Sequence, residues 1–177
     1  MLFYAYLIIY FCIYSVLGWI CETIFCYILK EKGKRGFLKG PYCPIYGVGA
    51  VTICYSLIAF KENIILVFLL SATIAVVLEY FTGYVLETVF NKKWWDYSDR
   101  EYNVKGRICL GNTILFGIMG VLVIYFIHPV IVSIVENFGY IYITIVSLII
   151  FTIFMYDTIV TTRKLLITND MTNLTID

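Results

Sequence analysis

Charged residues are scarce in this 177-residue sequence. Asp, Glu, Lys and Arg together make up 14% of the chain, against roughly 25% in an average soluble domain. The hydrophobic share is 62% and the mean hydropathy is +0.90. This balance excludes an ordinary soluble domain and predicts an all-α polytopic membrane protein. No polar segment is long enough to form a second domain, so we expect a single membrane domain over residues 1–177.

Other absences narrow the chemistry. The net charge is only +1, and the basic residues gather in short loops, so we expect no nucleic-acid partner. The six cysteines form no C-x-x-C pair and have no histidine at zinc-like spacing, so neither a metal nor a cofactor is expected. A cation held by oxygen atoms alone stays open. The chain also lacks a Gly-x-x-x-x-Gly-Lys-Ser/Thr phosphate loop, so any ATPase must be a separate protein.

Long hydrophobic runs are abundant, and crossing a bilayer takes about 20 apolar residues. Five predicted spans cover residues 2–29, 44–60, 64–90, 108–127 and 140–161. The fourth span should stop at His128-Pro129, which leaves residues 130–135 at the interface. Because no basic segment precedes the first run, it is expected to be a retained span and not a signal peptide.

Lys and Arg are distributed unevenly between the two sides of the predicted membrane. Twelve of the 13 follow the first, third and fifth spans. Because basic residues stay in the cytosol, both basic loops and the C-terminus are predicted to be cytosolic and the N-terminus to lie outside. The expected location is the cell membrane, crossed several times.

One stretch of the chain occurs twice. Gly18-Trp-Ile-Cys-Glu22-Thr-Ile-Phe25 returns 65 residues later as Gly83-Tyr-Val-Leu-Glu87-Thr-Val-Phe90. Lys39-Gly-Pro-Tyr-Cys43 is echoed, 66 residues on, by Lys105-Gly-Arg-Ile-Cys109. Self-similarity at a fixed spacing predicts a tandem duplication of a helix–loop–helix unit.

The two predicted repeats cover about residues 1–62 and 64–128, and an extra span follows at about 140–162. Both repeats run in the same direction, so we expect a pseudo-twofold axis along the membrane normal. Glu22 and Glu87 should then face each other across that axis.

Three glutamates fall within predicted spans, where an ionisable side chain costs about 3 kcal/mol and by default faces the bundle interior. Glu22 and Glu87 lie near the cytosolic ends of their helices, and Glu79 lies deeper. We predict a polar chamber open to the cytosol, able to bind a cation, relay a proton or act as acid or base. In the alternative interpretation, hydrogen-bonded carboxyls only clamp helices together; this second role is favoured for Asp157 in the last span.

The basic loops offer a second kind of site. Gly36, Gly40, Pro41 and Pro44 allow the first loop to turn back tightly, and the following helix N-terminus, close to Arg35, is a candidate anion site. Alternatively, the loop is only attracted to anionic lipid. In the second loop, Trp94 and Trp95 are typical of an interfacial aromatic belt. The adjacent carboxylate, Asp96, is expected to pair with Arg35, Arg100 or Arg107.

Several of these motifs resemble one bacterial family. Arg35-Gly-Phe-Leu-x-Gly-Pro-x-Cys-Pro-Ile-Tyr-Gly47, Gly18-Trp-Ile-x-Glu22 and Trp95-Asp96-Tyr97-Ser98 are similar to the family known as putative ABC-transporter permease, CmpB-like. The resemblance covers about residues 1–130 and implies a multi-pass inner-membrane permease component. Matching signature positions are Glu22, Arg35, Gly36, Pro41, Cys43, Pro44, Tyr46, Gly47, Glu79 and Asp96. The second repeat departs from the first, with Arg107 where Pro41 would be expected, so the two loops need not share a function.

The predicted function is a membrane permease component with a cytosol-facing polar site. Expected partners are the lipid bilayer, a separate ATPase or second permease chain, and a second copy of the chain. One alternative is a membrane-embedded enzyme or lipid-handling protein acting at the inner leaflet, and another is a non-catalytic scaffold. No catalytic residue is assigned, and the candidate substrate-binding residues are Glu22, Arg35, Tyr46, Glu79, Glu87, Asp96 and Arg107.

Overall fold

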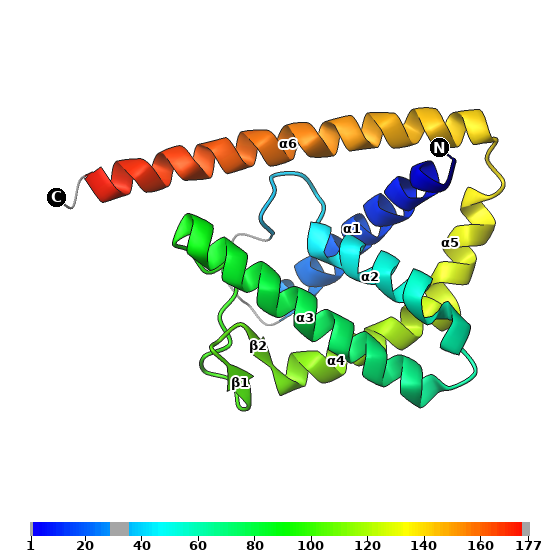
Figure 1. Cartoon of the computed structure of the whole chain (residues 1–177), viewed down its shortest axis with the longest axis horizontal. Coiled ribbons are helices and arrows are strands. Elements are labelled where there is room, and N and C mark those ends of the chain that lie inside the picture. Colours follow the sequence, from blue (N-terminus) through cyan, green and yellow to red (C-terminus); the bar gives the residue numbers. More distant parts are fainter. Residues whose placement is uncertain (1, 29–35, 175–177) are drawn as a thin grey trace.

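A computed structural model describes residues 2–28 and 36–174 and shows an almost entirely helical chain (Figure 1). This confirms the all-α membrane class. The helices are α1 (Leu2–Ile28), α2 (Pro44–Leu57), α3 (Ile64–Phe90), α4 (Leu110–Leu122), α5 (His128–Val135) and α6 (Tyr140–Leu174). A 3₁₀ turn, η1 (Ile58–Phe60), extends α2, and a π-helical turn, η2 (Val123–Ile127), joins α4 to α5. Two short strands, β1 (Asn103–Val104) and β2 (Ile108–Cys109), pair antiparallel.

Four of the helical segments are long and apolar enough to cross a membrane, namely Leu2–Ile28, Ile64–Phe90, Leu110–Val135 and Tyr140–Thr168. The remaining predicted span forms a shorter apolar helix, Pro44–Phe60. Its 14 residues of α2 and three of η1 extend about 25 Å at 1.5 Å per residue. That is less than the roughly 30 Å hydrocarbon core.

The prediction that the fourth span stops at His128-Pro129 is wrong. The helix continues to Val135, and residues 130–135 belong to it; Ile131 and Val135 are both buried. Pro129 has no N–H and its ring crowds the preceding turn, so the helix widens into η2 and bends there instead of ending. Figure 1 shows α5 turning away from the direction of α4. The Tyr14 hydroxyl hydrogen-bonds His128 Nδ1 at 2.8 Å and holds the bend against α1.

The two halves of the first hairpin lie unusually close together. A Cβ atom at Gly47 would overlap Ser15 Oγ on α1, and one at Gly18 would overlap the base of the Tyr46 ring on α2. At the opposite end, the rings of Phe3 and Tyr55 are in edge contact at 5.7 Å. Helix α2 therefore begins beside Gly18, about ten residues or 15 Å before α1 ends at Ile28.

The second hairpin has the same character. Glycines of α4 lie against α3, since a Cβ at Gly120 would overlap Ser71 and one at Gly117 would crowd the Phe68 ring. Arg107, just before α4, already reaches Tyr80, ten residues before the end of α3 at Phe90. Both α2 and α4 thus start deep beside their partner helices.

The segment between α3 and α4 folds back along α3. The turn after β1 has positive φ at Lys105 and Gly106 (54° and 68°) and is closed by the Arg107 N–H donating to the Val104 carbonyl at 3.1 Å. Two consecutive positive φ angles match the twist of a tight hairpin. The Trp95 indole N–H then donates to the Arg107 carbonyl at 3.0 Å. These contacts hold the polar loop 91–109 against the helix.

Candidate functional site

Glu79 is the deepest acidic side chain of α3 and is only 5% exposed. Its Oε1 accepts a hydrogen bond from the Tyr97 hydroxyl at 2.9 Å, whereas its buried Oε2 has no partner in the described part of the chain. Burial and the nearby Glu79 carboxyl raise the pKa of the Tyr97 phenol, so this hydroxyl remains a donor; a side-chain hydrogen bond with Asn112 opposes the shift. Buried polar atoms are nearly always paired, so the free Oε2 requires an explanation.

Glu22 lies on α1 beside the start of α2. Its Oε2 accepts a hydrogen bond from the Cys43 thiol at 3.2 Å. Cys43 is 2% exposed, and its backbone N–H donates to the Ser15 carbonyl at 2.9 Å. Burial, followed by the neighbouring Glu22 carboxyl, raises the pKa of the thiol, which keeps the proton needed for this bond. Within residues 2–28 and 36–174, no lysine or arginine forms an ion pair with Glu22.

Tyr46 lies near both of these carboxyls. It is on the first turn of α2, with its ring against Gly18 and 6.2 Å from the Phe116 ring. Its phenol lies within electrostatic range of Glu22, Cys43 and Glu79. The structure thus brings together three predicted site residues from three helices. We call the set Glu22, Cys43, Tyr46, Glu79 and Tyr97 the central polar cluster.

Cys43 and Tyr97 were not among the predicted binding residues. Two sequence signals pointed toward them. Cys43 has a counterpart in the second repeat, and Tyr97 belongs to the Trp-Asp-Tyr-Ser motif in the loop that follows α3.

Glu87 pairs within its own hairpin and not with Glu22. Arg107 donates from Nη2 and Nε to Glu87 Oε2, at 2.7 and 2.9 Å. The guanidinium also stacks over the rings of Tyr80 and Tyr84, at 5.3 and 5.2 Å. The predicted Glu22–Glu87 pair across a common axis is not seen, because each glutamate takes a partner from the loop that follows its helix.

Asp96 pairs with no arginine that the structure describes. It accepts from the Lys93 ammonium at 2.8 Å and from the Ser98 N–H at 3.0 Å, in an exposed part of the loop. Lys93 lies three residues away, so this pair forms locally, whereas Arg107 pairs with Glu87. Arg35, the third predicted partner and the predicted anion anchor, lies outside the described residues.

The pairing of Asp96 gives loop 91–109 a defined dependence on pH. The hydrogen bond from Lys93, then those from Ser98, lower the pKa of Asp96 from 3.8 to about 2. A depressed folded-state pKa stabilises the loop above the unfolded-state value, and this contribution is lost as pH falls from about 4 toward 2. We expect tryptophan fluorescence to be constant from pH 7 to 4 and to shift below that.

Two variants check the assignment. Asp96→Asn should show the shifted spectrum already at pH 7, while Asp99→Asn, at another exposed carboxylate of the loop, should match the wild type. An unchanged acid transition in Asp96→Asn would contradict the role given to Asp96.

Asp157 fastens the first loop to α6. Its Oδ2 accepts from the N–H groups of Lys39 and Gly40, at 3.1 and 2.9 Å, and from the Tyr42 hydroxyl at 2.7 Å. Its Oδ1 accepts from the Thr161 hydroxyl at 3.0 Å. The Asp157 carboxylate therefore occupies the backbone N–H groups just before α2. This is close to the place where an external anion was predicted to bind. These contacts are those of a clamp.

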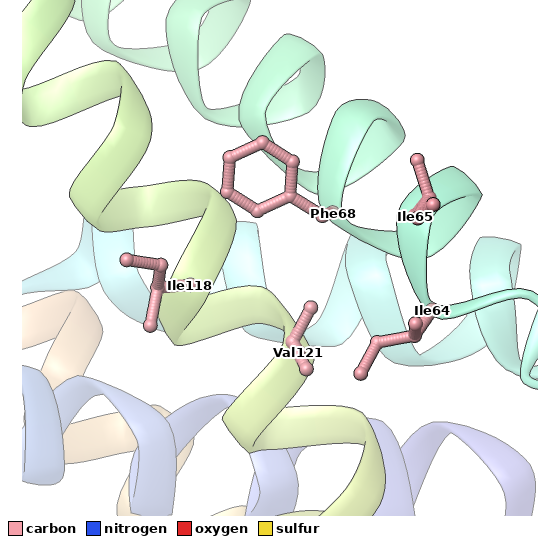
Figure 2. Close-up of a pocket in the computed structure, with 5 residues that line it drawn as sticks. All are labelled: Ile64, Ile65, Phe68, Ile118 and Val121. Atoms are coloured by element: carbon pink, nitrogen blue, oxygen red, sulfur yellow. The ribbon is translucent and has the colours of Figure 1, made fainter.

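Two hollows of the described surface are lined by residues outside the cluster. One, of about 290 Å³, is lined by Ile64, Ile65, Phe68, Ile118 and Val121 of α3 and α4 (Figure 2). Another, of about 370 Å³, lies between α1, α2 and α6. Their walls are almost wholly apolar and provide little that could recognise a polar solute.

Comparison with known proteins supports the motif resemblance. A family model described as "Putative ABC-transporter type IV" matches residues 9–162. The matched range contains every residue of the central polar cluster. The chain matches no curated protein and no solved structure. Because the matched range covers most of the 177 residues, the chain belongs to the CmpB family of putative type IV ABC transporters.

Proposed function

We propose that the chain is the membrane-embedded permease component of an ABC-type transporter, and that the central polar cluster is its solute site, reached from the cytosol. The observation that carries this proposal is Glu79, a 5%-exposed carboxyl on a membrane-spanning helix whose Oε2 has no partner among the described residues. Intramembrane ionisable groups are costly and mark solute or proton pathways by default.

The shape of the hairpins supports a transport role. Helices α2 and α4 both begin deep beside their partners, and Tyr46 and Asn112 lie in their first turns. Interrupted helices that start within the membrane are typical of transporter binding sites, because their free N–H groups and loop atoms line a polar region. The loops 36–43 and 91–109 pack against that region from the side to which α1 and α3 run.

The energy source is proposed to be a separate ATPase. The sequence contains no phosphate-binding loop, so nucleotide must bind to another chain. With the basic loops in the cytosol, that partner docks on their side of the membrane, and a second permease chain or second copy completes the pathway.

Purification of the tagged full chain in mild detergent tests the partner. We expect mass spectrometry to identify an ATPase that co-purifies with it. Retrieval of the chain alone would overturn the ABC-type assignment.

Glu79→Gln tests the site. The amide retains an oxygen for the Tyr97 hydroxyl but removes the charge, so the variant should fold, keep its ATPase and lose transport. In a deletion strain, its metabolite profile should match the deletion, whereas Glu62→Gln, at an exposed position between α2 and α3, should restore the wild-type profile. A wild-type profile in Glu79→Gln would instead favour a scaffold whose carboxyls only hold helices together.

A further inference from the structure

The second hairpin shows how this chain holds a cation. On α3, Tyr80, Tyr84 and Glu87 share one face, and the Arg107 guanidinium lies on that face between the two rings and the carboxylate. Charge pairing and cation–π contact act together here. We call the pair formed by a carboxylate and an aromatic ring three residues before it, here Glu87 and Tyr84, a cation holder.

The first hairpin repeats this arrangement, and no lysine or arginine that the structure describes occupies it. Trp19 and Glu22 precede Tyr84 and Glu87 by 65 residues and have the same i, i+3 spacing on a helix, so the two pairs have the same relative placement. At the position that matches Arg107, 66 residues earlier, the chain has Pro41. Proline provides no charge, and indole is the strongest cation–π ring.

The packing around the two holders is also comparable. Tyr46 lies against Gly18, and Trp95 lies against Gly83, where a Cβ would be 3.3 Å from Trp95 Cζ2. In each hairpin, an aromatic side chain of the returning segment thus covers the glycine next to the holder. The position that matches Tyr80 in the first hairpin is Ser15, which has no ring. The second aromatic group near Glu22 is instead Tyr46 of α2.

The charges of the cluster are unbalanced. Among the described residues, the Cys43 thiol is the donor that Glu22 receives, and Glu79 Oε2 receives none. Among the lysines and arginines that the structure describes, only Arg107 is not exposed, and it is committed to Glu87. Glu79 is buried and Glu22 partly buried, and carboxylates removed from water without a counter-charge favour a positive ligand. Residues 2–28 and 36–174 contain no group of three His, Cys, Asp or Glu side chains suited to a metal ion, which favours a nitrogen cation.

We propose that Trp19 and Glu22 bind a guanidinium or ammonium group, in the place that Arg107 occupies in the second hairpin, with Tyr46 and Glu79 beyond it. The inference rests on the proposed function, because it names the chemical class of the solute at that site. The solute is thus a cation with N–H donors.

Binding to the purified full chain in detergent tests this directly. The probes are methylguanidine and methylammonium chloride, with sodium chloride at equal ionic strength and sodium phosphate as controls. We expect methylguanidine to bind by calorimetry and to raise the melting temperature, since a ligand of the folded state stabilises it. Glu22→Gln should weaken binding at least about tenfold, and Glu62→Gln should not.

Two further variants use the repeat. Pro41→Arg supplies a resident guanidinium and should abolish probe binding. Arg107→Ala empties the second holder, so methylguanidine should raise its melting temperature more than that of the wild type, and adding Glu87→Gln should remove this extra gain. If Pro41→Arg does not fold, Glu22→Gln remains the test of the first hairpin, and Arg107→Ala tests whether the matching arrangement binds the same probe.

Equal binding by the wild type and Glu22→Gln, or binding of phosphate in place of the cations, would overturn the inference. Neither result would affect the co-purification of an ATPase. Conversely, a chain purified without an ATPase would still bind the probes if the cation site is correct.

Discussion

Gly47→Ala is expected to destabilise the protein by about 2–3 kcal/mol, the usual cost of overpacking a tight contact. A Cβ at this position would overlap Ser15 Oγ and lie 2.5 Å from the Phe11 carbonyl oxygen on α1. The hydroxyl can rotate away, but a backbone carbonyl within a helix cannot, so α1 and α2 must separate. Gly18→Ala should have a similar effect, because the new Cβ would fall on Cβ and Cγ of Tyr46, which the α2 backbone fixes.

Gly111→Ala is the matched control. A Cβ at Gly111 would meet no atom within 4 Å, although this glycine is also in the first turn of a helix, α4. Alanine favours helix over glycine by up to about 1 kcal/mol, so this variant should be neutral or slightly stabilised. Unfolding of the purified variants in one detergent measures all three. A loss at Gly111 equal to that at Gly47 would show that any added methyl disturbs the bundle and would contradict the close-approach argument.

The helices could largely be predicted from the sequence because hydrophobic runs record them directly. The predicted third span, residues 64–90, coincides with α3, which begins where the Asn63 side chain accepts from the Leu66 N–H and ends at Asn91 in a left-handed conformation. The fourth helix was mispredicted because Pro129 was interpreted as a stop. Within a membrane, neighbouring helices and local π-type adjustments accommodate a proline, and here the contact from Tyr14 to His128 supplies that support.

The folded-back loops could not be derived from composition. Loop 91–109 is polar and basic, which indicates cytosol, yet Tyr97 reaches a carboxyl 18 residues earlier in the chain. The structure is needed to show that the loop after Phe90 runs back along α3. Composition likewise does not show how deep the first loop reaches, so the short length of α2 could not be predicted either.

The sequence indicated which acidic residues lie on the apolar helices but not which side chains they pair with. The burial of Glu79 follows from the cost of exposing an acid to lipid, so its interior position was predictable, whereas Glu22 is only partly buried. The partners of these glutamates depend on which loop atoms lie next to them, and this the sequence does not show. The repeat suggested a symmetric pair, but the two copies differ at Pro41 and Arg107. Asp96 is a simpler case, since Lys93 is three residues away and a short loop closes at lower entropic cost than a long one.

Asp157→Ala is expected to raise the rate of Cys43 alkylation by roughly a hundredfold, because every ~1.4 kcal/mol lost from the closed loop increases the open population tenfold. The carboxylate receives four hydrogen bonds, three of them from loop 36–43. Hydrogen bonds to charged groups contribute about 1.5–3 kcal/mol each and are not additive, so a loss of about 3 kcal/mol is reasonable.

Cys43 reports the release of this loop for two reasons. It follows Tyr42 directly, so its burial depends on the clamp, and its pKa is raised by burial and by Glu22. Alkylation requires the thiolate, so opening exposes the sulfur and also returns its pKa toward the ordinary value. Both changes increase the rate.

The measurement uses single-cysteine variants treated with a maleimide and followed by mass spectrometry. Cys54 is equally buried, at 2% exposure, but hydrogen-bonds Tyr14 far from the clamp, so its alkylation should not change in Asp157→Ala. Thr158→Ala is the control on α6, because Thr158 donates only to the Phe154 carbonyl of its own helix. Faster alkylation of Cys54 as well would indicate general loosening of the bundle. An unchanged rate at Cys43 would mean that α6 does not hold the loop, and that the start of α2, with Tyr46 and the Cys43–Glu22 contact, is positioned by α1 alone.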